Sequence, residues 1–216
     1  MIVVTGAGRC GSSLMMQTLS LLGVPMIGNP EKDFGVNTMM HEDSEGILAA
    51  RLMKMNPKGY WELPISEIYQ MVDNGFPEHT GHAIKVMGAA FTQLDTDDIE
   101  RVIFCKRRDR LTQAEGLHKL SQIDLQIKDG SNSKDLPYID WFRNKNVSDV
   151  FGRQELTLNH IQYVLSTDEV PTLDIFFEDI VSNPKPEIEK VVHFLNLDVD
   201  ISKAIENVDV RNEASV

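Results

Sequence analysis

The stretch "VVTGAGRCGSSLM" (residues 3–15) decides how the rest of the sequence is interpreted. Residues 2–5 form a short apolar, β-branched run, which predicts a buried parallel strand. A loop with three glycines follows, and apolar residues then recur at helical spacing until Gly23. Ser12 and Ser13 are expected to cap this helix. Because a glycine loop at a helix N-terminus offers unpaired N–H groups, the stretch predicts an anion-binding site.

Two known glycine patterns overlap in this loop. Residues 6–11 spell G-x-G-x-x-G, which is typical of dinucleotide-binding folds. That pattern requires a second strand that ends in an acidic residue about 20 positions further on. The sequence there, "GVPMIGNPEKDFG" (23–35), is interrupted by a proline, which argues against this interpretation. Residues 6–13 also spell G-x-x-x-x-G-S-S, a P-loop in which Ser12 replaces the lysine that holds nucleoside triphosphates.

Without that lysine, the loop still offers backbone N–H groups, two hydroxyls and the guanidinium of Arg9. These donors suit a single phosphate or phosphosulfate at the N-terminus of a helix. A nucleoside triphosphatase or kinase would need its cation from elsewhere in the chain. A third alternative is a capped strand–turn–helix that binds no ligand.

The rest of the chain alternates strands and helices, which predicts an α/β fold with a parallel sheet covered on both faces. With 216 residues, 42% of them apolar, the chain suits a single domain, residues 1–216. Core strands are expected at 81–87, 100–110 and 171–179, and helices at 64–71, 111–120, 148–165 and from Asn183 onward. Ser148 is expected to cap the third of these helices, and Asn183 and Pro184 are expected at the N-cap and first position of the fourth. The polar segment 122–146 is expected to form a long loop or lid that carries acceptor specificity.

Charge and cysteine content narrow the function classes. A net charge of −12 argues against non-specific binding to nucleic acid or to an anionic membrane. No apolar run reaches about 18 residues, so a cytoplasmic protein is expected. The two cysteines, Cys10 and Cys105, lack metal-ligand spacing and are expected to be reduced thiols.

The segment "CKRRDRLTQAEG" (105–116) concentrates positive charge in this acidic chain. It follows a predicted strand, and ligands of open α/β sheets bind at the carboxyl ends of the strands. We therefore expect a second anion site beside the first, which suggests a nucleotide with phosphates at both ends. The alternative is a solvated charged loop.

Four segments resemble the PAPS-dependent sulfotransferases, especially the bacterial carbohydrate type. "GAGRCGSSLM" (6–15) looks like the family's 5′-phosphosulfate loop, in which Lys or Arg precedes a small residue, glycine and two Ser or Thr. "CKRRDRLTQAEGL" (105–117) is similar to its 3′-phosphate segment, whose core is R-R-D-x-L-x-Q-A. "FFEDIVSNPKPEIEKVVHFLNL" (176–197) and "NPKGYWE" (56–62) also resemble family segments, so the matches span most of the chain.

The resemblance implies a three-layer, P-loop NTPase-like fold with a central parallel sheet flanked by helices. It implies that 3′-phosphoadenosine 5′-phosphosulfate (PAPS) is the sulfonate donor and that no metal is needed. Arg9 would neutralise the leaving phosphate together with the N–H groups of residues 10–13. The residues implied at the 5′ end are Gly8, Arg9, Cys10, Gly11, Ser12 and Ser13. Arg108 would bind the 3′-phosphate, and Gly116 stands where the family has a serine.

Lys85 matches a family lysine that approaches the sulfonate, although a lysine at the end of a core strand can simply extend to the surface. The cytosolic branch has a histidine base two residues later, where this chain has Met87. The general base is therefore expected to be Asp33 or Glu62, each of which could equally be a surface charge. Further candidates for the base are Glu31 and His41.

The activity implied is sulfonate transfer to a hydroxyl of a small metabolite or glycan. Two other functions stay open. One is a P-loop kinase or NTPase-like nucleotide-binding protein, and the other is a non-catalytic binding protein with the sulfotransferase fold. The sequence does not indicate an oligomeric state.

Overall fold

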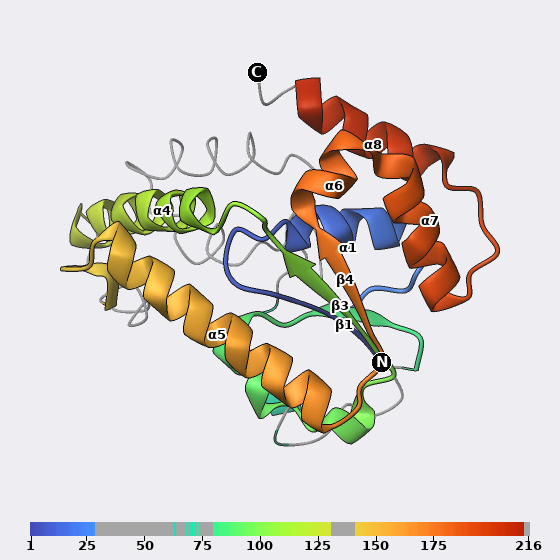
Figure 1. The fold of residues 1–216 in the computed structure, drawn as a ribbon, viewed down its shortest axis with the longest axis horizontal. Coiled ribbons are helices and arrows are strands. Elements are labelled where there is room, and N and C mark those ends of the chain that lie inside the picture. The colour runs from blue at the N-terminus through green and yellow to red at the C-terminus, as the bar shows by residue number, and fades with distance from the viewer. Residues whose placement is uncertain are drawn as a thin grey trace.

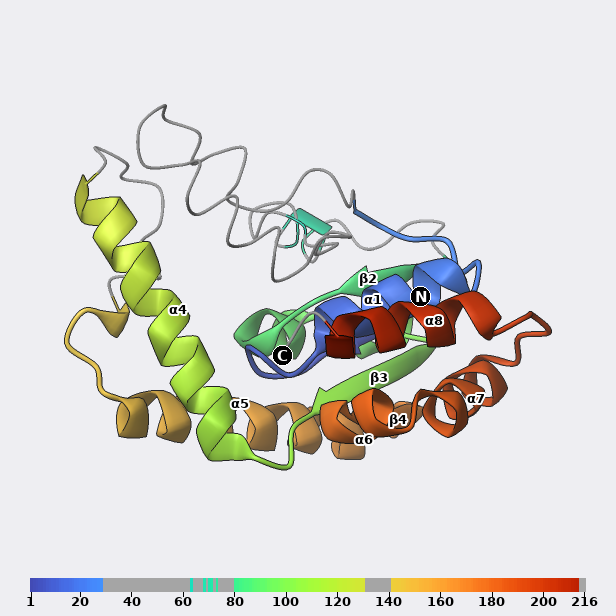
Figure 2. The same cartoon turned by 90° about the horizontal axis from the view of Figure 1, so that it is seen from above.

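The computed structural model describes residues 1–28, 63, 68, 70, 71, 73, 80–130 and 141–213. Its elements form three layers, in which one parallel sheet lies between two layers of helices (Figures 1 and 2). Of the helix expected at 64–71, the described residues Ile68, Gln70 and Met71 are helical. Within the described ranges, no helix is both long and apolar enough to cross a membrane.

The sheet has four parallel strands in the order β2-β1-β3-β4. Their bounds are Ile2–Thr5 (β1), Ala83–Lys85 (β2), Arg101–Lys106 (β3) and Thr172–Phe176 (β4). All four strands expected from the apolar, β-branched runs are present, and β1 lies between β2 and β3. Because the strands are parallel, the loop after β1 and the basic segment after β3 leave the sheet at the same edge.

Side chains alternate between two cores, one on each face of the sheet. On one face Ile2 and Val4 pack with helices α1 (Ser12–Leu21), α6 (Phe177–Ser182), α7 (Pro184–Leu195) and α8 (Ser202–Glu213). On the other face Val3 packs with α5 (Val147–Thr167) and with the 3₁₀ helix η1 (Gly88–Gln93). Figure 1 shows the two groups of helices on opposite sides of the strands. This arrangement confirms the expected α/β class.

The first helix begins differently from the sequence expectation. Its N-cap is Gly11, and no side chain caps it, so the capping expected from Ser12 and Ser13 is wrong. The two serines are instead the first residues inside the helix. Gly23, with φ +80°, follows the last turn as expected, because glycine tolerates this left-handed conformation.

The segment expected as a long loop is partly helical. Helix α4 runs over Arg110–Gly130, so residues 122–130 continue the helix expected at 111–120. Residues 131–140 lie outside the described part of the chain. Helix α5 begins at Val147, and Asn146 and Asp149 form a capping box there, so the expected cap, Ser148, is also wrong.

The C-terminal part contains two helices that the sequence analysis missed. The strand expected at 171–179 ends at Phe176, and α6 takes up the next six residues. Asn183 and Pro184 occupy the N-cap and first position of α7, as expected, but the Asn183 side chain makes no capping hydrogen bond. Helix α8 then packs on α1 and α7.

Candidate anion-binding site

The loop between β1 and α1 has the backbone shape of an anion cradle. Arg9 has φ +66° and Gly11 has φ +94°, and successive turns of this kind direct neighbouring N–H groups toward one point. Little space surrounds the glycines. A β-carbon added at Gly8 would lie 3.2 Å from Leu117 of α4, and one at Gly11 would overlap Phe177. Gly11 is therefore required where the backbone approaches α6, whereas a side chain at Gly8 would need Leu117 to shift.

Lys85 lies beside this loop, as expected. It ends β2, and its Nζ donates a hydrogen bond of 3.0 Å to Oγ of Ser13 in the first turn of α1. The residue is 3% exposed, so the alternative of a surface-directed edge lysine is wrong. A buried lysine that donates to a hydroxyl in the first turn of α1 adds a hydrogen-bond donor to the N–H groups at this helix N-terminus.

Arg9 carries the second positive charge of the loop, and its side chain is exposed. Gly116 of α4 lies close to it, since a β-carbon added at Gly116 would be 3.8 Å from Nε of Arg9. This is ordinary van der Waals spacing, so a β-carbon would fit at position 116. The structure therefore brings Arg9, Gly116, Ser13 and Lys85 around the same loop.

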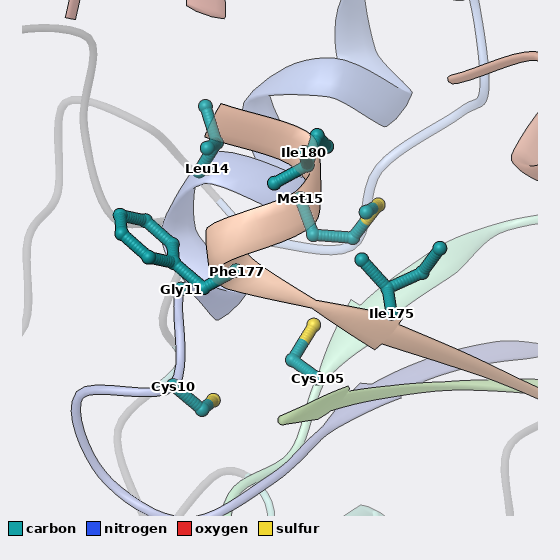
Figure 3. Close-up of a pocket in the computed structure, with 8 residues that line it drawn as sticks. All are labelled: Cys10, Gly11, Leu14, Met15, Cys105, Ile175, Phe177 and Ile180. Carbon is teal, nitrogen blue, oxygen red and sulfur yellow. The ribbon is translucent and has the colours of Figure 1, made fainter. Parts of the chain in front are cut away.

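Cys10 and Cys105 both line a small apolar pocket, together with Gly11, Leu14 and Phe177 (Figure 3). Both thiols are buried and free. The pKa of Cys10 is lowered to about 7, and the largest cause is a hydrogen bond with the Cys105 side chain. Hydrogen bonds with Ser12 and the charge of Lys85 lower this pKa further. Burial opposes this shift. The same pairing and burial raise the pKa of Cys105 well above its ordinary value.

The pairing leads to a pH prediction. Cys105→Ala should raise the pKa of Cys10 by about one unit or more, because the charge-assisted hydrogen bond is lost. The folded pKa of Cys10 lies below the unfolded value of about 8.5, so its stabilising contribution is absent below about pH 7 and grows as the pH rises. The thiolate ultraviolet absorbance of each protein, recorded against pH, measures the shift. Cys10→Ala is the control that should lack the transition, and an unchanged titration in Cys105→Ala would contradict the assignment.

Several basic side chains of the segment 105–116 form ion pairs with carboxylates of this chain. Lys106 pairs with Asp174 at 2.6 Å, and Arg110 pairs with Glu155 at 3.4 Å. Arg108, the expected 3′-phosphate residue, reaches both carboxylate oxygens of one aspartate, which is Asp179 of α6. The Arg108 side chain is 58% exposed and can be approached from solvent. Any anion at Arg108 would therefore share it with Asp179.

Three residues that hold the loop were not predicted to do so. Gln113 of α4 and Gln154 of α5 donate to loop carbonyls, as does Arg107, which directly follows β3. Arg107 and Gln113 match the R-R-D-x-L-x-Q-A core of the 3′-phosphate segment, so the resemblance marks both residues but not their contact with the loop. Nothing in the sequence marks Gln154, which contacts the loop from 146 residues away.

The candidate bases Asp33 and Glu62, like Glu31 and His41, lie outside the described residues, so their role stays a prediction. In the described part of the chain, no three His, Cys, Asp or Glu side chains gather as metal ligands.

No protein-family model matches the chain, and no curated protein matches it in sequence. Among solved structures, it is similar to retinol dehydratase in complex with androsterone and the inactive cofactor PAP, with a TM-score of 0.52 and 15% identity. It is also similar to retinol dehydratase in a complex with retinol and PAP, with a TM-score of 0.52 and 14% identity. Each alignment covers 96% of this chain and 64% of the other, so the chain spans less than two thirds of that protein. At such identity the likeness is one of fold.

Proposed function

We propose that this chain, which has the fold of the PAPS-dependent sulfotransferases, transfers a sulfonate group from PAPS to a hydroxyl of a small metabolite or glycan. The observation that carries the proposal is the contact between buried Lys85 and Ser13 at a glycine loop that also presents Arg9. Along this loop, the groups supply two basic side chains, hydroxyls and backbone N–H groups. The set suits a phosphosulfate, which has no γ-phosphate for a P-loop lysine to hold.

PAPS supplies an activated sulfonate, whose sulfur–oxygen bond breaks as the acceptor oxygen attacks and leaves adenosine 3′,5′-bisphosphate. The chain's residues would stabilise negative charge as it builds on the departing 5′-phosphate. Arg9 and the N–H groups of residues 10–13 are the proposed donors. Lys85, held by Ser13, would face the sulfonate oxygens.

The acceptor is proposed by analogy with the two similar structures. Retinol dehydratase has been crystallised with androsterone and with retinol, which are small molecules. We extend this to a small-molecule or carbohydrate acceptor here, with Asp33 or Glu62 as the base that removes the hydroxyl proton. A cytoplasmic location belongs to the same proposal, and the free thiols of Cys10 and Cys105 support it.

Calorimetric titration with adenosine 3′,5′-bisphosphate tests the proposal, with ATP plus magnesium as the control. Tight binding of the bisphosphate alone is the expected result. If the protein binds ATP plus magnesium but not the bisphosphate, it belongs instead to the kinase or NTPase class, in which the γ-phosphate and the metal are both required.

The 3′-phosphate site gives a further prediction. Arg108→Ala should weaken bisphosphate binding at least about tenfold, because a charge-assisted contact to the 3′-phosphate is lost. Asp179→Asn is the matched variant: it removes the carboxylate that holds Arg108, so it should leave binding unchanged or make it tighter. Dissociation constants from calorimetry decide between these results. Equal affinity in Arg108→Ala and the wild type would remove Arg108 from the site.

A second candidate is a non-catalytic nucleotide-binding protein of the same fold. Gly116 favours it, since the family's serine hydroxyl is missing next to Arg9. Met87 favours it too, because the histidine base of the cytosolic branch is absent. Bisphosphate release in the presence of PAPS and a panel of hydroxyl acceptors separates this candidate from an enzyme.

A further inference from the structure

The carbonyls of Ala7 and Gly8 in the loop accept hydrogen bonds from two buried glutamine side chains, one on α4 and one on α5. Nε2 of Gln113 donates to the carbonyl oxygens of Ala7 at 3.3 Å and Gly8 at 2.8 Å. Nε2 of Gln154 donates to the same Gly8 oxygen at 2.9 Å. Gln113 is 2% exposed and Gln154 is 6% exposed, so water does not compete with these bonds.

The carbonyls of the residues on either side, Gly6 and Arg9, also accept hydrogen bonds from protein donors. Nε of Arg107 donates to the carbonyl oxygen of Arg9 at 3.1 Å, while its guanidinium lies 3.8 Å from the centre of the Phe177 ring. The carbonyl of Gly6 accepts from the backbone N–H of Gly88 at 3.2 Å. Four consecutive carbonyls of the loop, those of residues 6–9, are therefore all bound to protein donors.

This pattern fixes the direction of the loop's N–H groups. In a planar trans peptide the C=O and N–H bonds point in opposite directions. Because the carbonyls of residues 7–9 face their side-chain donors, the N–H groups of residues 8–10 face away from them. A carbonyl turned the other way would place negative charge next to a bound anion and would leave a buried donor unpaired.

We propose that Arg107, Gln113 and Gln154, here called the carbonyl clamp, are positioning residues that orient the loop's peptide planes for anion binding. The inference rests on the proposed function for the identity of the anion. The clamp acts through the backbone and does not touch the ligand. Its members come from the end of β3, from α4 and from α5, so docking of these two helices is coupled to the affinity of the loop.

The orientation of the Gln113 amide supports a positioning role over simple packing. Its Oε1 is buried and finds no hydrogen-bond donor among the described residues. A flipped amide would place this oxygen against the carbonyls of Ala7 and Gly8, where like partial charges repel. The side chain thus forgoes a bond of its own and keeps both carbonyls occupied.

Methionine substitutions separate the two roles, because methionine matches glutamine in length but has no N–H donor. We expect Gln113→Met and Gln154→Met to retain the fold, since a buried apolar side chain replaces a buried amide. Each should weaken adenosine 3′,5′-bisphosphate binding by about fivefold to tenfold. In the double variant, the fold-loss of bisphosphate affinity should exceed the product of the two single fold-losses. The reason is that the Gly8 carbonyl keeps one donor in each single variant and none in the double variant.

NMR order parameters of the backbone N–H groups need no ligand and are the deciding measurement. In the wild type the N–H vectors of residues 8–10 should have values near those of rigid backbone, about 0.85, and in the double variant they should fall below about 0.6, with α4 and α5 unchanged. Gln162→Met, which removes an exposed glutamine elsewhere on α5, is the matched control and should change neither the order parameters nor the affinity. Unchanged order parameters of the loop in the double variant would overturn the inference. If the wild type fails to bind bisphosphate, the proposed function fails, and the order parameters alone still decide the clamp's role.

Discussion

Arg9→Ala should lower the rate of sulfonate transfer by about 100-fold to 1,000-fold, the range seen when one preorganised donor is removed from a developing negative charge. Arg9 is exposed on the loop, next to Gly116, and none of the core clusters includes its side chain. Alanine has the same β-carbon, so the strain of φ +66° is unchanged. The folded state should therefore keep its stability while turnover is lost.

Release of adenosine 3′,5′-bisphosphate from PAPS measures the effect, and urea unfolding measures stability. Lys185→Ala is the matched control, because it removes one exposed positive charge from α7, away from the loop. Arg9→Lys should recover part of the rate, since it restores a charge but not the planar fork of donors. Near-normal turnover in Arg9→Ala would contradict the assigned role.

The strands and the loop could be predicted because their signals are local. Residues 2–5 are continuously apolar and β-branched, and both sides of this strand are buried. The loop's three glycines and two serines follow at fixed spacing. Lys85 could be placed beside the loop only through the resemblance, because pairing of β1 with β2 over about 80 residues brings it there.

Two elements were misjudged for identifiable reasons. In the segment 122–130, the apolar residues Ile123, Leu125 and Ile127 recur at every second position, which does not favour a helix. They nevertheless continue α4. Phe177 extends a β-favouring run and so concealed the start of α6, although Glu178 and Asp179 in its first turn are typical of a helix N-terminus.

The contacts that complete the site depend on the tertiary structure. Arg108 could be recognised from its motif, but its pairing with Asp179 follows from the position of α6. Gln154 has no sequence signal at all, because its partner is a backbone carbonyl and any residue offers one. Sequence patterns thus identify groups that would touch a ligand, while residues that hold the backbone become visible only when the helices are placed.

Gly6→Ala should be the most destabilising of these substitutions, lowering the free energy of unfolding by about 3 kcal/mol or more. Gly6 has φ +155°, and a β-carbon there would lie 2.5 Å from the carbonyl oxygen of Cys105 and 2.7 Å from Sγ of Cys10. The first contact is with backbone of β3, which cannot move without breaking its pairing with β1. Urea unfolding and bisphosphate titration should both show the loss.

Gly23→Ala separates the clash from the strain of a positive φ. Gly23 has φ +80°, and an added β-carbon would meet nothing within 4 Å. Gly23→Ala should therefore lower the free energy of unfolding only by the strain of alanine at a positive φ, about 1–2 kcal/mol. Anion binding should stay unchanged. Equal losses of unfolding free energy in Gly6→Ala and Gly23→Ala would mean that the backbone of β3 shifts at Cys105 and relieves the clash. A larger loss at Gly6, together with weaker bisphosphate binding, would show that the approach of β1 to β3 sets the shape of the loop.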